Sequence, residues 1–229
     1  EQWIGLGRCG REELIVTVIG HAVHGADALL KPEALNAADE AAKLAVELGA
    51  FCRAERRFFQ ADGISSINSA FINRIVAGSG MLSVPDTATI TLDRTFLPDE
   101  SPEDFRVRVE RCIERCRSER VIDPRTRIEL ATRERPTPPC RAYAFPAALP
   151  VVSETVRTLE HSGIRTKFGL GRGVADENRL ALAGIPTLVV GPDGEGSHTS
   201  HEWVDVESVL RLERSLGLLV GSAPLHAAL

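Results

Sequence analysis

Aromatic side chains are scarce in this sequence: 229 residues include one tyrosine, two tryptophans and eight phenylalanines. Basic side chains are outnumbered as well, 27 against 32 acidic ones, so the net charge is -5 and the pI is about 5.7. Proteins that bind nucleic acids generally combine a basic surface with aromatic rings on which bases stack. Because the sequence is poor in both, we expect no nucleic-acid partner.

Long apolar runs and a disulfide pattern are missing too. No apolar stretch approaches the roughly 20 residues that a membrane-spanning helix needs, so we expect no membrane partner. The chain opens on Glu1-Gln2-Trp3, without the basic start and apolar core of a signal peptide; the missing initial methionine leaves open whether it is processed, trimmed or incomplete. The five cysteines are odd in number and scattered, which favours a reducing compartment and predicts a cytoplasmic protein.

The first 135 residues alternate between strand-like and helix-like patterns. With 43% hydrophobic and 26% charged residues, the chain has the composition of a globular protein of one or two domains. In chain order, the patterns predict a strand at 12–20, a helix at 33–59, strands at 65–77 and 86–96, a helix at 102–119 and a strand at 125–133. The order βαββαβ is that of a ferredoxin-like unit, so we expect one antiparallel four-stranded sheet with two helices on one face.

The second of these helices has a clear start. Ser101 can cap it, Pro102 suits its first turn, and Asp104 completes a capping box. Within this helix Cys112 and Cys116 lie four residues apart and hence on one face. A metal-binding pair is one interpretation, but two small buried residues are favoured, because no further His or Cys lies nearby in the sequence.

A proline-rich stretch, with Pro136, Pro138 and Pro139, separates this unit from the rest, so we place a domain boundary after residue 135. The remaining chain predicts helices at 149–161, 176–183 and 206–220, alternating with strands at 165–170 and 186–190. Alternating elements imply a parallel or mixed sheet. Two strands alone are too few for a sheet domain.

The stretch richest in chemically useful side chains is GPDGEGSHTSHEWVDV, which directly follows the last predicted strand. In open α/β sheets, ligands bind at the carboxyl ends of the strands. Its side chains include four possible metal ligands by residue type, namely Asp193, His198, His201 and Glu202. The alternative is a polar surface loop that contains histidines by chance.

The run GIPTLVVGP, a Gly-rich loop and then HTSHEWV resemble the C-terminal signature of the dinuclear zinc hydrolases, the family of aminoacylase, acetylornithine deacetylase, succinyl-diaminopimelate desuccinylase and glutamate carboxypeptidase. On this match His198 is a metal ligand and Glu202 is the acid that follows it four residues later. His201 falls at a position that the family does not use as a ligand, and Asp193 stands where glycine is usual.

The resemblance implies an α/β fold with an inserted α+β lid. The family has a zinc-binding α/β domain interrupted by a ferredoxin-like βαββαβ lid, which usually dimerises. Residues 1–11 then end a catalytic segment, 12–135 form the lid, and 136–229 form the C-terminal part of the zinc-hydrolase α/β domain. The family's remaining metal ligands and its general base belong to an earlier segment, whose His-x-Asp and Glu-Glu motifs do not occur in these residues.

His24 follows the first predicted lid strand, in the sequence VTVIGHAVHGA. Taken alone, it is typical of a surface or capping histidine. In the family, however, a Gly-x-x-x-His-Gly pattern at this place carries a histidine that reaches the active site, often that of the partner subunit, and stabilises the developing oxyanion. Gly20 to Gly25 match this pattern, so the resemblance implies a catalytic role for His24. His21 has no counterpart there and is expected to be a solvated loop residue.

Two further residues have substrate-binding roles by resemblance. Arg94 lies in TLDRTF, where the family has an arginine that binds the substrate carboxylate; the usual second arginine is Thr95 here, and a solvated strand arginine is the alternative. Ser83 stands where the family often has asparagine, which is a second departure from the family pattern. Gly173 belongs to a Gly-rich segment that precedes a helix and lines the family's substrate pocket, the alternative being a plain connection.

The resulting hypothesis is a metal-dependent hydrolase that cleaves an amide bond of an N-acyl amino acid or small peptide. Two zinc ions are expected in the complete enzyme, with cobalt or manganese as alternatives, and a homodimer is expected through the lid. Without the earlier segment we expect the chain alone to be inactive. The alternative function is a non-catalytic dimerisation or small-ligand-binding module built on the lid.

Overall fold

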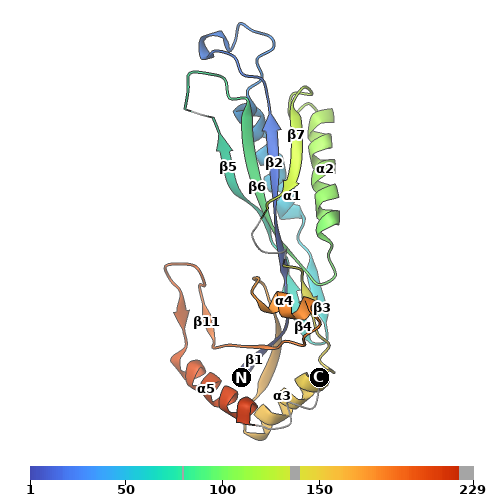
Figure 1. Cartoon of the computed structure of the whole chain (residues 1–229), viewed down its shortest axis with the longest axis vertical. Helices are drawn as coiled ribbons and strands as arrows, with labels where there is room; N and C mark the ends of the chain where they lie inside the picture. The colour runs from blue at the N-terminus through green and yellow to red at the C-terminus, as the bar shows by residue number, and fades with distance from the viewer. Residues whose placement is uncertain (79, 135–139, 222–229) are drawn as a thin grey trace. The chain divides into compact units, whose positions relative to one another are not determined.

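The computed structural model describes residues 1–78, 80–134 and 140–221 (Figure 1). The chain divides into two compact units. Unit 1 comprises Glu1–Gly10, Phe58–Ser66 and Cys140–Leu229, and unit 2 comprises Arg11–Arg57 and Ile67–Pro139. Each unit is built from segments that are distant in sequence. No helix in the described parts of the chain has the length and apolar character needed to cross a membrane.

Unit 2 contains the sheet that the sequence predicts. Its strands are β2 (Gly10–Ile19), β5 (Ala70–Ala77), β6 (Thr87–Phe96) and β7 (Arg127–Thr132), in the order β5-β6-β2-β7. β5 pairs antiparallel with β6, and β2 pairs antiparallel with β7. The Gly20 amide, just after β2, donates to the Asp86 carbonyl, just before β6, so these two central strands also run in opposite directions. The predicted antiparallel ferredoxin-like arrangement is confirmed.

Both helices of unit 2, α1 (Ala37–Ala54) and α2 (Pro102–Ser118), pack on one face of this sheet. The face is apolar because alternate residues of each strand point the same way. The shared core contains residues from the two strands and both helices, among them Leu14, Val16, Val18, Ile90, Leu92, Leu44, Leu48, Val109 and Ile113. Ser101 caps α2 by accepting a hydrogen bond from the Asp104 amide, as predicted.

The predicted helix at 33–59 and strand at 65–77 have different bounds in the structure. Asn36 caps α1, whose helical residues therefore begin at Ala37. After α1 the chain forms a two-stranded hairpin of β3 (Phe58–Ala61) and β4 (Ile64–Ile67) before β5 begins. The sequence pattern had merged β3 with the helix and β4 with β5.

Unit 1 is organised around β1 (Gln2–Arg8), a strand that the sequence patterns did not predict. β1 pairs parallel with β9 (Thr166–Gly171) and antiparallel with two short strands, β8 (Tyr143–Ala144) and β10 (Val189–Val190). The predicted mixed sheet therefore forms, but with four strands rather than two. Its helices are α3 (Pro150–His161), α4 (Glu177–Leu182) and α5 (Val206–Gly221), close to the predicted ranges.

Candidate functional site

His24 lies in a loop that the rest of unit 2 holds firmly. The loop follows β2 and contains a short 3-10 helix, η1 (Gly25–Asp27). Backbone hydrogen bonds tie it to the loop before β6: the Val84 amide donates to the Val23 carbonyl at 2.9 Å, and the Gly25 amide to the Leu82 carbonyl at 3.3 Å. We call these two segments, residues 20–36 and 80–86, the tip loops; both lie at the upper end of unit 2 in Figure 1.

The ring of His24 is exposed, and one of its nitrogens is occupied. Nδ1 accepts a hydrogen bond from the Ala26 amide at 3.2 Å, which caps η1. A neutral imidazole with an accepting Nδ1 carries its proton on Nε2. This leaves an outward N–H that is available to a ligand, so capping and donation are compatible in one side chain. His21 is also exposed, and its backbone pairs with Leu35, which fits a loop residue.

Arg94 is a core residue of unit 2. Its side chain is 1% exposed, and its guanidinium pairs with Glu100 at 2.7 Å and donates to the Glu55 carbonyl at 3.1 Å. The guanidinium carbon also lies 4.9 Å from the ring centre of Phe105. Burial lowers the pKa of Arg94, and the nearby Glu100 opposes that shift. In this structure the guanidinium is therefore buried, and it faces neither a substrate carboxylate nor solvent. Neither the carboxylate-binding arginine nor the solvated strand arginine expected from the sequence describes it.

In unit 1, β1 and β9 run parallel, and their carboxyl ends share one edge of the sheet, where the Gly173 loop begins. Arg8, at the end of β1, forms an ion pair with Glu177 and donates to the Gly173 carbonyl at 3.3 Å. Gly173 itself is exposed, and a Cβ added there would meet no atom within 4 Å. Its place at this edge agrees with a ligand-facing loop, although nothing around it requires glycine.

Asn178 anchors this loop from beneath and is completely buried. Its side chain accepts from the Ala175 amide at 2.9 Å and donates to the carbonyls of Cys9 at 3.1 Å and Arg141 at 2.8 Å. The neighbouring Tyr143 is 9% exposed, and burial raises the pKa of its hydroxyl. The sequence patterns pointed to none of these anchors, because each is defined by partners that are distant in the chain.

His198 lies at the end of a hairpin formed by β11 (Gly194–Glu195) and β12 (Trp203–Val204). Its backbone has a φ of 65°, and its amide donates to the Glu202 carboxylate at 3.3 Å. Glu202 thus holds the turn that carries His198. The side chains of His198, His201 and Glu202 are all exposed.

Asp193 has a structural place below this hairpin. Its carboxylate pairs with Arg211 at 2.7 Å and with Lys167 at 3.8 Å, and its backbone amide donates to the Ser208 hydroxyl at 2.8 Å. Asp193 therefore fixes the start of the hairpin to α5 and β9, a role that accounts for its charge without a metal ion.

The described residues do not make a complete metal site. Among them, no group of three or more His, Cys, Asp or Glu side chains is placed to hold an ion. His198 offers one imidazole to a metal, and a zinc ion in proteins takes three or four ligands. Cys112 and Cys116 on α2 are buried and form no disulfide, in agreement with the expectation of two small buried residues.

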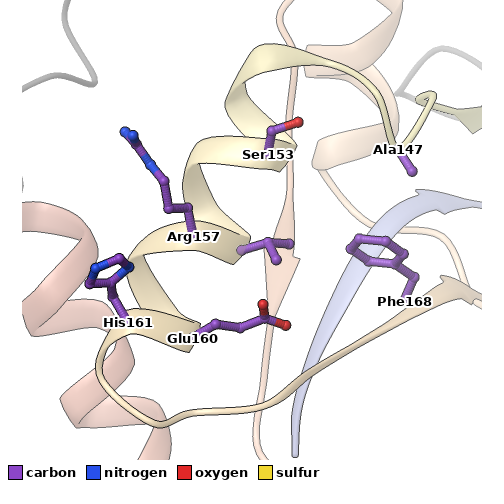
Figure 2. Close-up of a pocket in the computed structure, with 7 residues that line it drawn as sticks. Ala147, Ser153, Arg157, Glu160, His161 and Phe168 are labelled. Atoms are coloured by element: carbon purple, nitrogen blue, oxygen red, sulfur yellow. The ribbon is translucent and has the colours of Figure 1, made fainter.

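A surface pocket of about 630 Å³ lies between α3 and β9 (Figure 2). Figure 2 shows Glu160 on the side of Phe168, with Arg157 and His161 on the other side of the helix. Arg157 pairs with Glu154, and Glu160 accepts from the Thr166 hydroxyl at 3.1 Å.

Comparison with known proteins agrees with the fold of both units. Residues 6–117, a range that contains His24 and Arg94, match the family model described as the peptidase dimerisation domain, of the M20 type. No curated protein matches the chain by sequence.

Solved structures resemble nearly the whole chain. A tripeptidase from Staphylococcus aureus has a TM-score of 0.66 at 17% identity, with 95% of this chain and 52% of that one covered. An aminopeptidase from Bacillus cereus has a TM-score of 0.65 at 19% identity, with 95% of this chain and 53% of that one covered. An amidase of the hydantoinase/carbamoylase family from Burkholderia vietnamiensis has a TM-score of 0.68 at 14% identity, with 95% of this chain and 49% of that one covered.

At these identities the similarity shows a shared fold, and the chain spans about half the length of the solved structures that it matches. The family match identifies the ferredoxin-like unit, most of which lies within residues 6–117, as a peptidase dimerisation domain. The sequence motifs around Gly20 to Gly25 and around His198 resemble the same family. Residues 6–117 therefore match the peptidase dimerisation domain of the M20 type, and nearly the whole chain shares its fold with solved peptidases and amidases.

Proposed function

We propose that this chain is the lid and C-terminal segment of a metal-dependent hydrolase that cleaves an amide bond of an N-acyl amino acid or small peptide. The observation that carries the proposal is the state of His24. Its Nδ1 is committed to the Ala26 amide, its ring is exposed, and it belongs to the dimerisation domain of a peptidase family. The peptidase and amidase names of the structural neighbours support the same class of reaction.

The role proposed for His24 is to donate a hydrogen bond from Nε2 to the oxyanion that forms when the scissile carbonyl is attacked. Such a donor acts mainly in the transition state, where the negative charge has developed. The η1 cap keeps the ring in one tautomer and one orientation, so no reorganisation is needed during the reaction. A second copy of the chain is the proposed partner, with the lid as the dimerising element.

The metal requirement is part of the proposal. Zinc is the expected metal, with two ions in the whole enzyme and cobalt or manganese as substitutes. When bound, the metal would supply an activated water and a polarised carbonyl. Of the candidate residues in this chain, His198 is the proposed ligand, and we propose that the remaining ligands and the general base belong to a segment outside these residues.

The test is a hydrolysis assay on two forms of the protein. The first is this chain alone, and the second is the product of its gene including any residues encoded before Glu1. Both are offered N-acetyl amino acids and tripeptides, with zinc, cobalt or manganese added after chelator treatment. We expect metal-dependent amide cleavage by the longer form and none by the chain alone.

Two outcomes would go against the proposal. If the gene encodes no further metal-binding segment, the chain is better described as a dimerisation or small-ligand-binding module. If a longer form exists but cleaves none of these amides with any metal, the proposed class of reaction is wrong.

A further inference from the structure

A second surface pocket, of about 510 Å³, lies in unit 2 between α1 and α2. Its volume is in the range of sites that hold small molecules. Each helix contributes one wall: Glu47, Ala50, Phe51 and Ala54 come from α1, and Arg108, Arg111, Cys112 and Arg115 come from α2. The wall on α1 is mostly apolar, whereas the wall on α2 combines three guanidinium groups with one thiol.

The sulfur of Cys112 lies at the floor of this pocket, although only 6% of the residue is exposed. Its Sγ accepts a hydrogen bond from Nη2 of Arg115 at 3.8 Å. The side chain of Arg115 is 53% exposed. Because a guanidinium at the surface touches the sulfur, this thiol lies directly beneath the surface and not deep between the two helices.

The three arginines differ in their partners. Arg108 donates to the Glu55 carboxylate at 2.9 Å, and Arg115 pairs with Glu47 at 3.3 Å. Arg111 is exposed, and no ion pair joins it to an acidic side chain within residues 1–78, 80–134 and 140–221. A guanidinium in this state can bind a carboxylate of a ligand through two parallel hydrogen bonds. The residue next to it in the chain is Cys112.

The other four cysteines lack this combination of access and charge. Cys9 is completely buried. Burial raises the pKa of Cys52 and of Cys116 to about 11 in each case, and a thiol that stays protonated reacts slowly. Cys140 is partly exposed, but it belongs to unit 1 and does not line the pocket.

We propose that Cys112 is a modification site for small disulfides that carry carboxylates, which bind with a carboxylate at Arg111 and exchange at the Cys112 sulfur. The thiolate of Cys112 attacks one sulfur of the disulfide, so one S–S bond forms and the original one breaks. The other half leaves as a thiolate and takes up the proton that Cys112 has lost. The disulfide is itself the oxidant, so the exchange needs no further redox partner and no hydrolase activity.

The test compares two disulfides of opposite charge on the full chain. Oxidised glutathione, which has a net negative charge, is the probe, and cystamine, which carries ammonium groups and no carboxylate, is the control reagent. Cleavage after Arg111 and Arg115 places Cys112 and Cys116 in different peptides, so mass spectrometry assigns each adduct. Each rate is divided by that of the same cysteine in urea-unfolded protein, which removes the intrinsic reactivity of the reagent.

We expect the normalised rate at Cys112 to be about fivefold or more higher with oxidised glutathione than with cystamine, because the positive charge of the pocket concentrates the anion. Arg111→Gln should slow the reaction with oxidised glutathione about threefold to fivefold, the effect of one solvated ion pair, without slowing the reaction with cystamine. Arg106→Gln is the matched control, because Arg106 lies on the same helix, pairs with Glu110 and does not line the pocket; its variant should react like the parent.

Four results would overturn the proposal. They are equal normalised rates with both reagents, equal slowing by the two arginine variants, the absence of an adduct at Cys112 under conditions in which Cys140 reacts, and equal rates at Cys52, Cys112 and Cys116. The last result would mean that the thiols react only when unit 2 unfolds.

Discussion

Arg94 shows how the environment of one residue decides its role. The resemblance to an amidase family placed an arginine on this strand as a ligand for the substrate, but here its guanidinium is held by Glu100 inside unit 2. Glu100 is itself 2% exposed at its side chain and also accepts from the Asn68 side chain and the Leu97 amide. The pair therefore joins β6, the segment after it and the chain that leaves the β3–β4 hairpin.

Replacing Glu100 with glutamine should strongly destabilise unit 2. The substitution removes the nearest counter-charge of the buried Arg94 and leaves it only the Glu55 carboxylate at 3.8 Å. Breaking a buried ion pair from one side costs about 3 kcal/mol or more. Glu110→Gln is the matched control, because Glu110 pairs with Arg106 at 3.2 Å on the exposed face of α2, with side chains 49% and 44% exposed; an exposed pair contributes at most about 0.5 kcal/mol. The free energy of unfolding in urea separates the two, and equal losses would show that Arg94 is stabilised by its other contacts.

Asp123 is expected to make the stability of unit 2 depend on pH in the acidic range. The Arg125 side chain donates hydrogen bonds to this carboxylate and, with the Arg125 amide, lowers the pKa of Asp123 from 3.8 to about 2. Because the folded pKa is the lower one, the stabilisation is complete above about pH 4 and is lost as the pH falls through 2. The Asp123 side chain is 28% exposed, so we expect its charge to stabilise the folded state by only about 1 kcal/mol.

Asp123→Asn tests this, because asparagine can still accept from the Arg125 amide while it lacks the charge. The variant should unfold about 1 kcal/mol more easily than the parent at pH 7, and the difference should shrink towards zero near pH 2. Urea unfolding at several pH values gives the comparison. A difference that stays constant down to pH 2 would mean that the charge is not the cause.

At the scale of elements, the β3–β4 hairpin depends on two backbone conformations. Asp62 and Gly63, the two residues between its strands, have φ values of 48° and 77°. Both central residues of a type I′ turn need positive φ, a region that glycine adopts without strain. Gly63→Ala should therefore cost about 1 kcal/mol.

Gly173→Ala is a suitable control for the hairpin variant. Gly173 has open space around a Cβ, and its φ is not in the positive region, so the same substitution should have little effect there. Amide hydrogen exchange of β3 and β4 measures the local cost. Unchanged exchange in Gly63→Ala would show that the strand pairing, rather than the turn, holds the hairpin.

The same hairpin shows which elements a sequence can predict. An Asp-Gly pair between two strand-like runs is a strong hairpin signal, and it was present at Asp62-Gly63, but the helical composition before it and the long β-rich run after it obscured both strands. β2, β6, α1 and α2 were predictable because each has one buried face with a regular period. β8 has only two residues and exists through its pairing with β1, so no local pattern predicts it. The strand predicted at 186–190 is present only as β10, its last two residues, which pair with β1.

β1 was missed for a further physical reason. Its sequence QWIGLGR contains two glycines, which count against a strand in any local pattern. In the structure, a Cβ at Gly7 would lie 2.2 Å from the Tyr143 carbonyl, and one at Gly5 would lie 2.6 Å from the Trp3 ring. The glycines are thus needed because neighbours approach closely, which only the folded chain reveals. Among the candidate functional residues, His24 and His198 were found through sequence motifs, whereas Arg8 and Asn178 were not.

At the scale of the whole molecule, the metal content is the first quantity to measure. We predict that this chain alone binds zinc weakly or not at all, because His198 supplies one ligand and the described residues contain no cluster of three. Isothermal titration calorimetry with zinc, on the chain and on a His198→Ala variant, tests this. Tight stoichiometric binding that is lost in the variant would contradict the prediction and point to a site formed by His198 with His201.

The last prediction concerns cooperation between two copies of the enzyme, in whatever longer form carries the activity. His24→Ala should lower turnover by about 100- to 1000-fold while changing substrate binding little, because an oxyanion donor acts mainly in the transition state. His21→Ala is the control, because His21 lies in the same loop without such a role, and its variant should keep normal turnover.

Since the lid is expected to dimerise and to present His24 to the partner subunit, mixing His24→Ala subunits with His198→Ala subunits should rebuild one working site in each hybrid dimer. That site would combine His24 from one copy with the intact metal-binding histidine of the other. Subunit exchange must first be verified, for example with differently tagged copies, because slow dissociation would hide the rescue. Normal turnover in His24→Ala would return this residue to a loop histidine that caps η1. A severe defect that verified hybrids do not relieve would keep the catalytic role of His24 and place it in the active site of its own subunit.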